Sequence, residues 1–204
     1  MAMYQQLLAN YFSITEKETK QIIDKTSSAA LEAANELIKE AQKQGGRVHV
    51  TGIGKPGHVA HYIASLYSSI GTPTYFLDGT EAIHGSSGQV EAGDVVIALS
   101  NSGETEELKK TVQTLKNNAA MIIGVSGREH SWLAEQSEVF LFAGVEAEGD
   151  TLNKPPRASI LAEIIVLQAL SILLQEENQL DPEMYYKWHP GGSLGAAIKG
   201  SVKR

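Results

Sequence analysis

Short apolar segments alternate with longer helical patterns along most of this 204-residue chain. Strands that alternate with helices form βαβ units, and right-handed crossovers between them give a parallel sheet with helices on both faces. The sequence therefore predicts an α/β fold, a three-layer αβα sandwich around a five-stranded parallel sheet. The predicted strands span residues 47–51, 74–77, 95–99, 121–125 and 139–142.

A long helical pattern covers residues 13–44. Ser13 and Glu16 have the spacing of a capping box, and two glycines at 45–46 supply a stop signal, so we expect one continuous helix here. The pattern over 158–176 is apolar on nearly every side, which predicts a deeply buried helix. Other helices are predicted over 56–70 and 106–115, with a short one after Asp181.

Composition narrows the class of protein. Hydrophobic residues make up 42% of the chain and charged residues 20%, with a net charge of −7 and no cysteine. An acidic surface argues against a nucleic-acid or anionic-membrane partner, and the lack of cysteine excludes disulfides and cysteine zinc sites. No apolar run approaches ~18–20 residues and no secretory leader opens the chain, so we expect a cytoplasmic protein.

The length favours a single domain over residues 1–204. Within it we expect three parts. A helical segment covers about 1–45, the α/β core about 46–178, and a C-terminal helical segment about 179–204.

The run Ser-Asn-Ser-Gly-Glu-Thr at residues 100–105 lies where a predicted strand turns into a helix. Free backbone N–H groups and the helix dipole favour an anion at such a place, and hydroxyl groups add donors. Serine at a strand–helix junction also occurs as a plain helix cap. Taken alone, the run leaves a phosphate site and a structural cap open.

A glycine-rich turn, Gly-Ile-Gly-Lys at residues 52–55, follows the first predicted strand. Lys55 would stand at a helix start, where the dipole opposes a cation, so an anionic ligand explains it better than a solvated surface role. Residues 52–57 also fit a GxGxxG pattern, which is a weak signal for a dinucleotide site. Both turns follow strands at the same edge of the predicted sheet, and this convergence favours the phosphate interpretation.

Four motifs occur in order along the chain: GIGK at 52–55, EAIHG at 81–85, SNSGET at 100–105 and HPGG at 189–192. In this order they resemble the sugar isomerase (SIS) domain of the arabinose-5-phosphate isomerase family, also called the KpsF/GutQ family. The resemblance implies a flavodoxin-like SIS fold. Many members continue into paired CBS domains, and this chain resembles the short form without them.

The resemblance implies a metal-independent aldose–ketose isomerisation of a phosphorylated sugar through a cis-enediol, without a cofactor. It assigns Lys55 to stabilising charge on the phosphate or the enediolate, and Glu104 to acid–base work. His84 matches a further functional position, and His189 is suited to ring opening or proton transfer. The matched phosphosugar-binding residues are Gly54, Ser100, Asn101, Ser102 and Thr105.

The chain departs from the family pattern at several positions. Pro56 replaces the usual serine after the lysine, and Ser86 replaces the usual aspartate after His-Gly. A further catalytic glutamate matches either Glu146 or Glu148, and Glu148 is our candidate. A Ser/Thr pair of the family is reduced to Ser159, which leaves the identity of the sugar open.

Two functions from different classes fit these residues: an isomerase, and a sensor that binds phosphosugars without turnover. Retention of the four matched acid–base and charge-stabilising residues favours the enzyme. A 6-phospho-3-hexuloisomerase-like activity is a third possibility, against which the HPGG motif argues. His58 and His61 have metal-ligand spacing on one helix, but no third ligand is evident, so we predict no metal site.

The predicted helices carry more apolar surface than one sheet can cover. Together with the resemblance, this predicts a homo-oligomer, either a dimer or a tetramer. We further expect His84 or His189 to reach the site of a neighbouring subunit.

Overall fold

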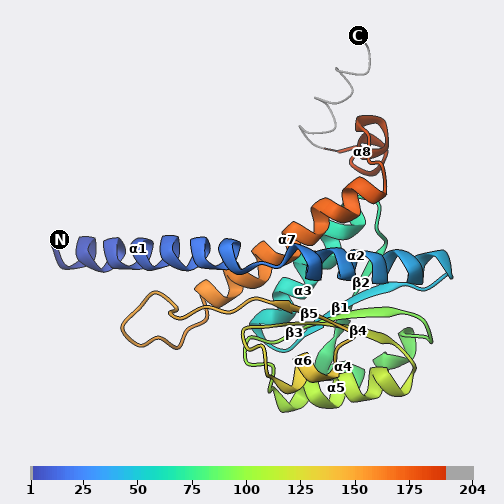
Figure 1. Ribbon diagram of the computed structural model, residues 1–204, viewed down its shortest axis with the longest axis horizontal. Helices are drawn as coiled ribbons and strands as arrows, with labels where there is room; N and C mark the ends of the chain where they lie inside the picture. Colours follow the sequence, from blue (N-terminus) through green and yellow to red (C-terminus); the bar gives the residue numbers. More distant parts are fainter. Residues whose placement is uncertain (1, 192–204) are drawn as a thin grey trace, which may run out of the picture.

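Five parallel strands form the centre of the molecule, in the order β2-β1-β3-β4-β5 (Figure 1). The computed structural model describes residues 2–191. The strands are β1 (Val48–Gly52), β2 (Thr74–Asp78), β3 (Val95–Leu99), β4 (Met121–Ser126) and β5 (Val139–Phe142). The predicted five-stranded parallel sheet is confirmed.

Helices cover both faces of this sheet, so the predicted three-layer sandwich is also confirmed (Figure 1). One layer holds α2 (Ser28–Lys43), α3 (Lys55–Ser69) and α7 (Ala158–Glu177); the other holds α4 (Gly79–Ala82), α5 (Glu106–Asn117) and α6 (Trp132–Gln136). Two hydrophobic clusters, one on each side of the sheet, fill the space between the layers. The remaining elements are α1 (Ala2–Lys25), the 3₁₀ turn η1 (Ser86–Gln89) and α8 (Pro182–Trp188).

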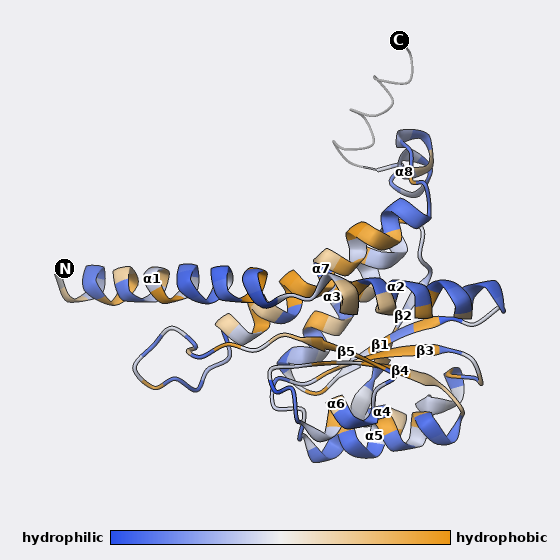
Figure 2. Cartoon of the chain, in the orientation of Figure 1, coloured by the Kyte–Doolittle hydropathy of each residue, from blue (hydrophilic) through white to orange (hydrophobic). Residues whose placement is uncertain are grey.

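Helix α7 is apolar around most of its surface (Figure 2). By length and composition it could cross a membrane, yet half of its most apolar stretch is buried inside the structure. It packs against α1, α2 and α3, and the Tyr67 hydroxyl of α3 donates a 2.9 Å hydrogen bond to the carbonyl of Leu167. These contacts bury one side of α7, whereas Leu161 and Ile172 are exposed, so the predicted deep burial holds for only part of the helix.

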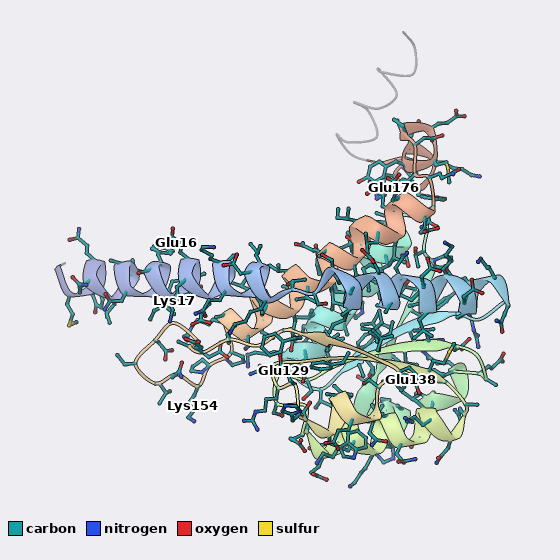
Figure 3. The ribbon with its side chains drawn as sticks, in the orientation of Figure 1. Glu16, Lys17, Glu129, Glu138, Lys154 and Glu176 are labelled. Carbon is teal, nitrogen blue, oxygen red and sulfur yellow. The ribbon has the colours of Figure 1, made fainter. Side chains whose placement is uncertain are left out.

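The prediction of one continuous helix over residues 13–44 is wrong. Helix α1 (Ala2–Lys25) begins earlier and ends before Ser27, which caps α2 by accepting a hydrogen bond from the backbone N–H of Ala30. Ser13 and Glu16 lie inside α1, where both are exposed, and Glu16 points away from the body (Figure 3). Ser27 has extended backbone angles, φ −84° and ψ 112°, and so interrupts the helical path.

Candidate functional site

The two predicted ligand loops meet at the edge formed by the carboxyl ends of the strands. In the sheet register, Gly52 at the end of β1 pairs with Asp78 of β2 and with Leu99 of β3. The loops after these strands therefore start side by side. Since β1 lies between β2 and β3, the strand order reverses at this point, and sheets of this kind bind ligands there.

The loop after β1 is short and tight. Gly54 has a φ of 67°, in the left-handed region that glycine adopts without steric cost. A Cβ on Gly52 would lie 2.8 Å from the carbonyl carbon of Pro56, so the end of β1 packs directly on the start of α3. Lys55 is the first residue of α3 and is exposed. The dipole of α3 opposes this cation, which an anion bound beside it would offset.

The loop after β3 is held in shape by its own hydroxyl groups. Ser100 is buried; its Oγ accepts a hydrogen bond from the Gly103 N–H at 3.1 Å and lies 3.1 Å from the Thr105 Oγ1. The Ser102 Oγ accepts from the Glu104 N–H at 3.1 Å. Asn101 is exposed at the start of the loop. The loop is therefore preorganised before any ligand arrives.

Thr105 is the N-cap residue of α5, and between residues 2 and 191 no hydrogen bond joins its side chain to the first turn. This turn begins at the same edge of the sheet as Lys55. A helix N-terminus with free N–H groups favours an anion such as a phosphate.

A second layer of residues behind this loop escaped the sequence analysis. The Leu133 N–H donates to the Gly103 carbonyl at 3.1 Å, and the Ser131 Oγ lies 3.0 Å from the Ser126 Oγ. A Cβ on Gly103 would collide with the side chain of Ser131, and Gly103 also has a φ of 67°. Gly103 is thus required both for its backbone conformation and for this close approach. It is the residue of the sequence that could have indicated a second layer packed behind the loop.

Glu104 lies just before α5, and each of its carboxylate oxygens has one hydrogen-bond donor. Its Oε1 accepts from the Trp132 N–H at 2.7 Å, and its Oε2 lies 2.8 Å from the Lys109 Nζ. The hydrogen bond from Lys109, followed by that from Trp132, lowers the pKa of Glu104. The carboxylate is therefore held ionised, and its side chain remains 41% exposed.

The two candidate glutamates, Glu146 and Glu148, lie in different surroundings. Glu148 is buried, and its Oε2 accepts from the N–H groups of Arg157 at 2.7 Å and Ser159 at 3.1 Å. It thereby joins the loop after β5 to the start of α7, at the same edge of the sheet. Glu146 is exposed and pairs instead with Lys17 at 3.0 Å; Lys17 lies on the side of α1 that faces this loop (Figure 3).

The two predicted histidines lie in different places. His84 is exposed just after α4, beyond the carboxyl end of β2 and so on the site's side of the sheet. His189 follows α8, where its ring stacks on Tyr185 with 4.0 Å between centroids. Helix α8 packs through Trp188 on Gly71, at the amino end of β2 (Figure 1). His189 is therefore at the opposite edge of the sheet from the candidate site, and the last residue of the HPGG motif, Gly192, lies outside the described residues.

No group of three or more His, Cys, Asp or Glu side chains suited to an ion occurs between residues 2 and 191. His58 and His61 are both exposed on α3, and His61 packs on the ring of Phe76.

Comparison with known proteins identifies the family. The SIS domain profile matches residues 42–173, from the end of α2 through most of α7. The chain belongs to the SIS domain family. The SIS chain is 41% identical over 153 residues to arabinose 5-phosphate isomerase KdsD of Pseudomonas aeruginosa, in an alignment that covers 75% of this chain and 47% of that protein. It thus spans about half the length of the curated relatives it matches.

Solved structures share the fold over nearly the whole SIS chain. The E. coli CFT073 protein c3406, solved in complex with arabinose 5-phosphate, is 33% identical, with a TM-score of 0.82, covering 93% of this chain and 98% of that one. A putative sugar-phosphate isomerase from Listeria monocytogenes is 28% identical, with a TM-score of 0.82, covering 92% and 98%.

Proposed function

We propose that this SIS chain is a sugar-phosphate aldose–ketose isomerase of the arabinose 5-phosphate/ribulose 5-phosphate type. The observation that carries the proposal is the meeting of Lys55, at the start of α3, with the hydroxyl-lined loop at the start of α5. Two helix N-termini and a cation at one edge favour a phosphate group. The relatives named arabinose 5-phosphate isomerase and the neighbour in complex with that sugar phosphate support the same class of substrate.

The reaction moves a proton between two neighbouring carbons of the open-chain sugar. A base removes the C2 proton of the aldose while the C1 carbonyl oxygen takes up a proton, which gives the cis-enediol. Loss of the O2 proton and return of a proton to C1 then give the ketose. The residues must supply a base, stabilise charge on the oxygens and anchor the phosphate so that these carbons are positioned.

Glu104 is our choice for the base, because it is ionised and lies at the edge where the phosphate loops begin. Lys55 stabilises negative charge on the phosphate or on the enediolate. The phosphosugar is held by Gly54, Ser100, Asn101, Ser102 and Thr105. Glu148 serves as the second carboxylate, and His84 and His189 assist ring opening or proton transfer.

Deuterium exchange tests the proposal. The protein is incubated in D₂O with a panel of pentose and hexose phosphates, including arabinose 5-phosphate, and followed by NMR. We expect deuterium at C1 or C2 of one sugar, and a rate reduced by roughly 10²–10⁴-fold in Glu104→Gln, the contribution typical of a positioned base. Glu107→Gln, which changes an exposed carboxylate in the first turn of α5, is the matched control and should keep its rate. Thermal stabilisation by a sugar phosphate without any exchange would favour the sensor instead.

We propose in addition that the active unit is a homo-oligomer, either a dimer or a tetramer. The first half of α1 extends beyond the α/β body (Figure 1), with Tyr4 66% and Phe12 61% exposed. Leu7, Leu8 and Tyr11 line a groove of about 610 Å³ between α1 and the loop that follows Glu148. A second copy is the partner that would cover this surface beside the site.

The position of His189 supports a site shared between subunits, since it lies far from Glu104 within one chain. Mixing Glu104→Gln protein with His189→Ala protein tests this. Shared sites predict that activity returns on mixing, because some sites then receive both native residues. Inactive mixtures that still form mixed oligomers would contradict sharing, and a monomer at micromolar concentration would contradict the oligomer.

A further inference from the structure

A cluster of side chains around Glu104 goes beyond the residues that the family motifs mark. Lys109 lies on the first turns of α5, and its Nζ is 2.8 Å from the Glu104 Oε2 and 3.0 Å from the Glu106 Oε1. The same Nζ stands 5.9 Å from the centre of the Trp132 ring, on α6. The Lys109 side chain is only 24% exposed, less than either of its carboxylate partners.

The Glu104 carboxylate therefore accepts hydrogen bonds from two directions. Lys109 of α5 holds Oε2, and the backbone N–H of Trp132 holds Oε1 at 2.7 Å. The Glu104 N–H is in turn fixed by the Ser102 Oγ. Two donors from separate helices restrict the rotation of the carboxylate as well as its position. Each oxygen keeps one lone pair free for a substrate proton.

An isolated ion pair at a surface contributes little to stability. The consequence here is chemical, because the pair controls a group placed at the reacting edge. The charged groups that act on Glu104 are Lys109 from α5, which also pairs with Glu106, and Arg128 from the loop before α6. The two cations favour the ionised form of Glu104, and the share of Lys109 is the larger.

We propose that Lys109 is a positioning residue of the isomerase, which with the Trp132 N–H holds Glu104 in place as the base. This inference rests on the proposed function. A base must be ionised to accept the carbon-bound proton, and it must release that proton to the neighbouring carbon in the next step. At neutral pH a carboxyl group of ordinary pKa is already ionised, so the main contribution of Lys109 is to fix the position of the Glu104 carboxylate. Its ammonium group also opposes lasting protonation of Glu104, so that the proton passes on to the neighbouring carbon.

Lys109→Met tests the proposal, because it removes the charge and keeps a chain of similar length. Lys110→Met is the matched control: it removes one exposed positive charge from the next residue of the same helix. Lys109→Arg is the conservative variant, which retains the charge beside Glu104. The readouts are the pH dependence of kcat/KM and the titration of the Glu104 side-chain carboxyl by ¹³C NMR.

We expect the acid limb of the rate profile and the Glu104 titration to move to higher pH in Lys109→Met. The rate at neutral pH should fall roughly tenfold, as part of the effect of a positioned base is lost. Lys109→Arg should restore most of the rate, and Lys110→Met should leave both curves in place. The NMR titration does not require turnover, so it reports on Lys109 separately from activity.

Two failures can be told apart. If the wild-type protein isomerises a sugar phosphate and folded Lys109→Met keeps the wild-type profile and titration, the role of Lys109 is overturned and the proposed function stands. If the wild-type protein isomerises no sugar of the panel, the proposed function fails, and the role of Lys109 in the reaction fails with it.

Discussion

The two sides of the candidate site shift the pKa of a carboxyl group in opposite directions. On the α5 side, each oxygen of Glu104 accepts a hydrogen bond, and Lys109 lowers its pKa. On the α7 side, Glu163 is fully buried, and neither of its oxygens has a hydrogen-bond partner within residues 2–191. Burial raises the pKa of Glu163 to about 8. Donors in the surroundings, rather than the type of side chain, decide which form is stable.

Glu163 lies one helical turn beyond Ser159, whose N–H binds Glu148. The negative charge of Glu148 adds to the rise in the pKa of Glu163. The Ser159 Oγ is also buried, and it too lacks a partner in the described part of the chain. In the described part of the chain, the start of α7 therefore holds buried polar groups without hydrogen-bond partners, at a cost in free energy, whereas each carboxylate oxygen of Glu104 at the start of α5 has a donor. Buried acids of this kind occur more often near functional sites than elsewhere.

Replacing Glu163 gives the largest expected effect. Its pKa is about 8 in the folded protein against an ordinary 4.5, so the folded state binds the extra proton between these values. The contribution of Glu163 to the free energy of unfolding is therefore fully present below pH 4.5. It is lost as pH rises through 8, by up to about 1.4 kcal/mol per pH unit. Glu163→Met removes this titration and should be several kcal/mol more stable than the wild type at pH 8.

Urea unfolding at several pH values between 5 and 8 measures the difference. Glu176→Met is the matched control, because Glu176 lies on the same helix with its side chain exposed (Figure 3). The control should keep the wild-type dependence of stability on pH. An equally steep dependence in Glu163→Met would mean that another group titrates, and would remove the contrast between the two sides.

Glu148→Ala is the next largest change and acts on the same side. It leaves the part-buried N–H group of Arg157 and the buried N–H group of Ser159 without their acceptor, and one buried group in this state costs about 1–3 kcal/mol. We expect lower stability together with lost isomerase activity. Glu146→Ala breaks only an exposed pair with Lys17, so its unfolding curve should stay close to the wild type. Equal losses in the two variants would contradict the anchoring role of Glu148.

The strands and the meeting of the two loops could be predicted from the sequence for one reason. A parallel strand is buried on both faces, so it reads as a continuous apolar run, as Val95–Leu99 does. Once the strands alternate with helices, the topology brings the loops after them to one edge. Lys55 and the 100–105 loop meet without any further information.

Other features depend on contacts that no local pattern encodes. The different surroundings of Glu146 and Glu148 follow from the path of the loop after β5 and from Lys17, which is far away in the sequence. The pairing of Lys109 with Glu104 requires the turn of chain that opens α5. Glu163 is the only charged residue between 160 and 174, but the sequence could not show that its carboxyl group lacks a hydrogen-bond partner among residues 2–191. The capping box at Ser13 failed because the same spacing also occurs inside helices.

The smallest expected effect concerns helix caps. It compares Ser13, which caps no helix, with Ser131, which caps α6 on the α5 side of the site. The Ser131 Oγ accepts from the Ala134 N–H at the start of α6 and bonds the Ser126 hydroxyl behind Gly103. Ser131→Ala should therefore cost about 1 kcal/mol and loosen the loop that carries Glu104, which raises KM for a sugar phosphate. Ser13→Ala lies within α1 and should cost nothing, since alanine favours the helix interior. If Ser13→Ala proved the more damaging in urea unfolding, the hydroxyl network would not be what holds the α5 side in shape.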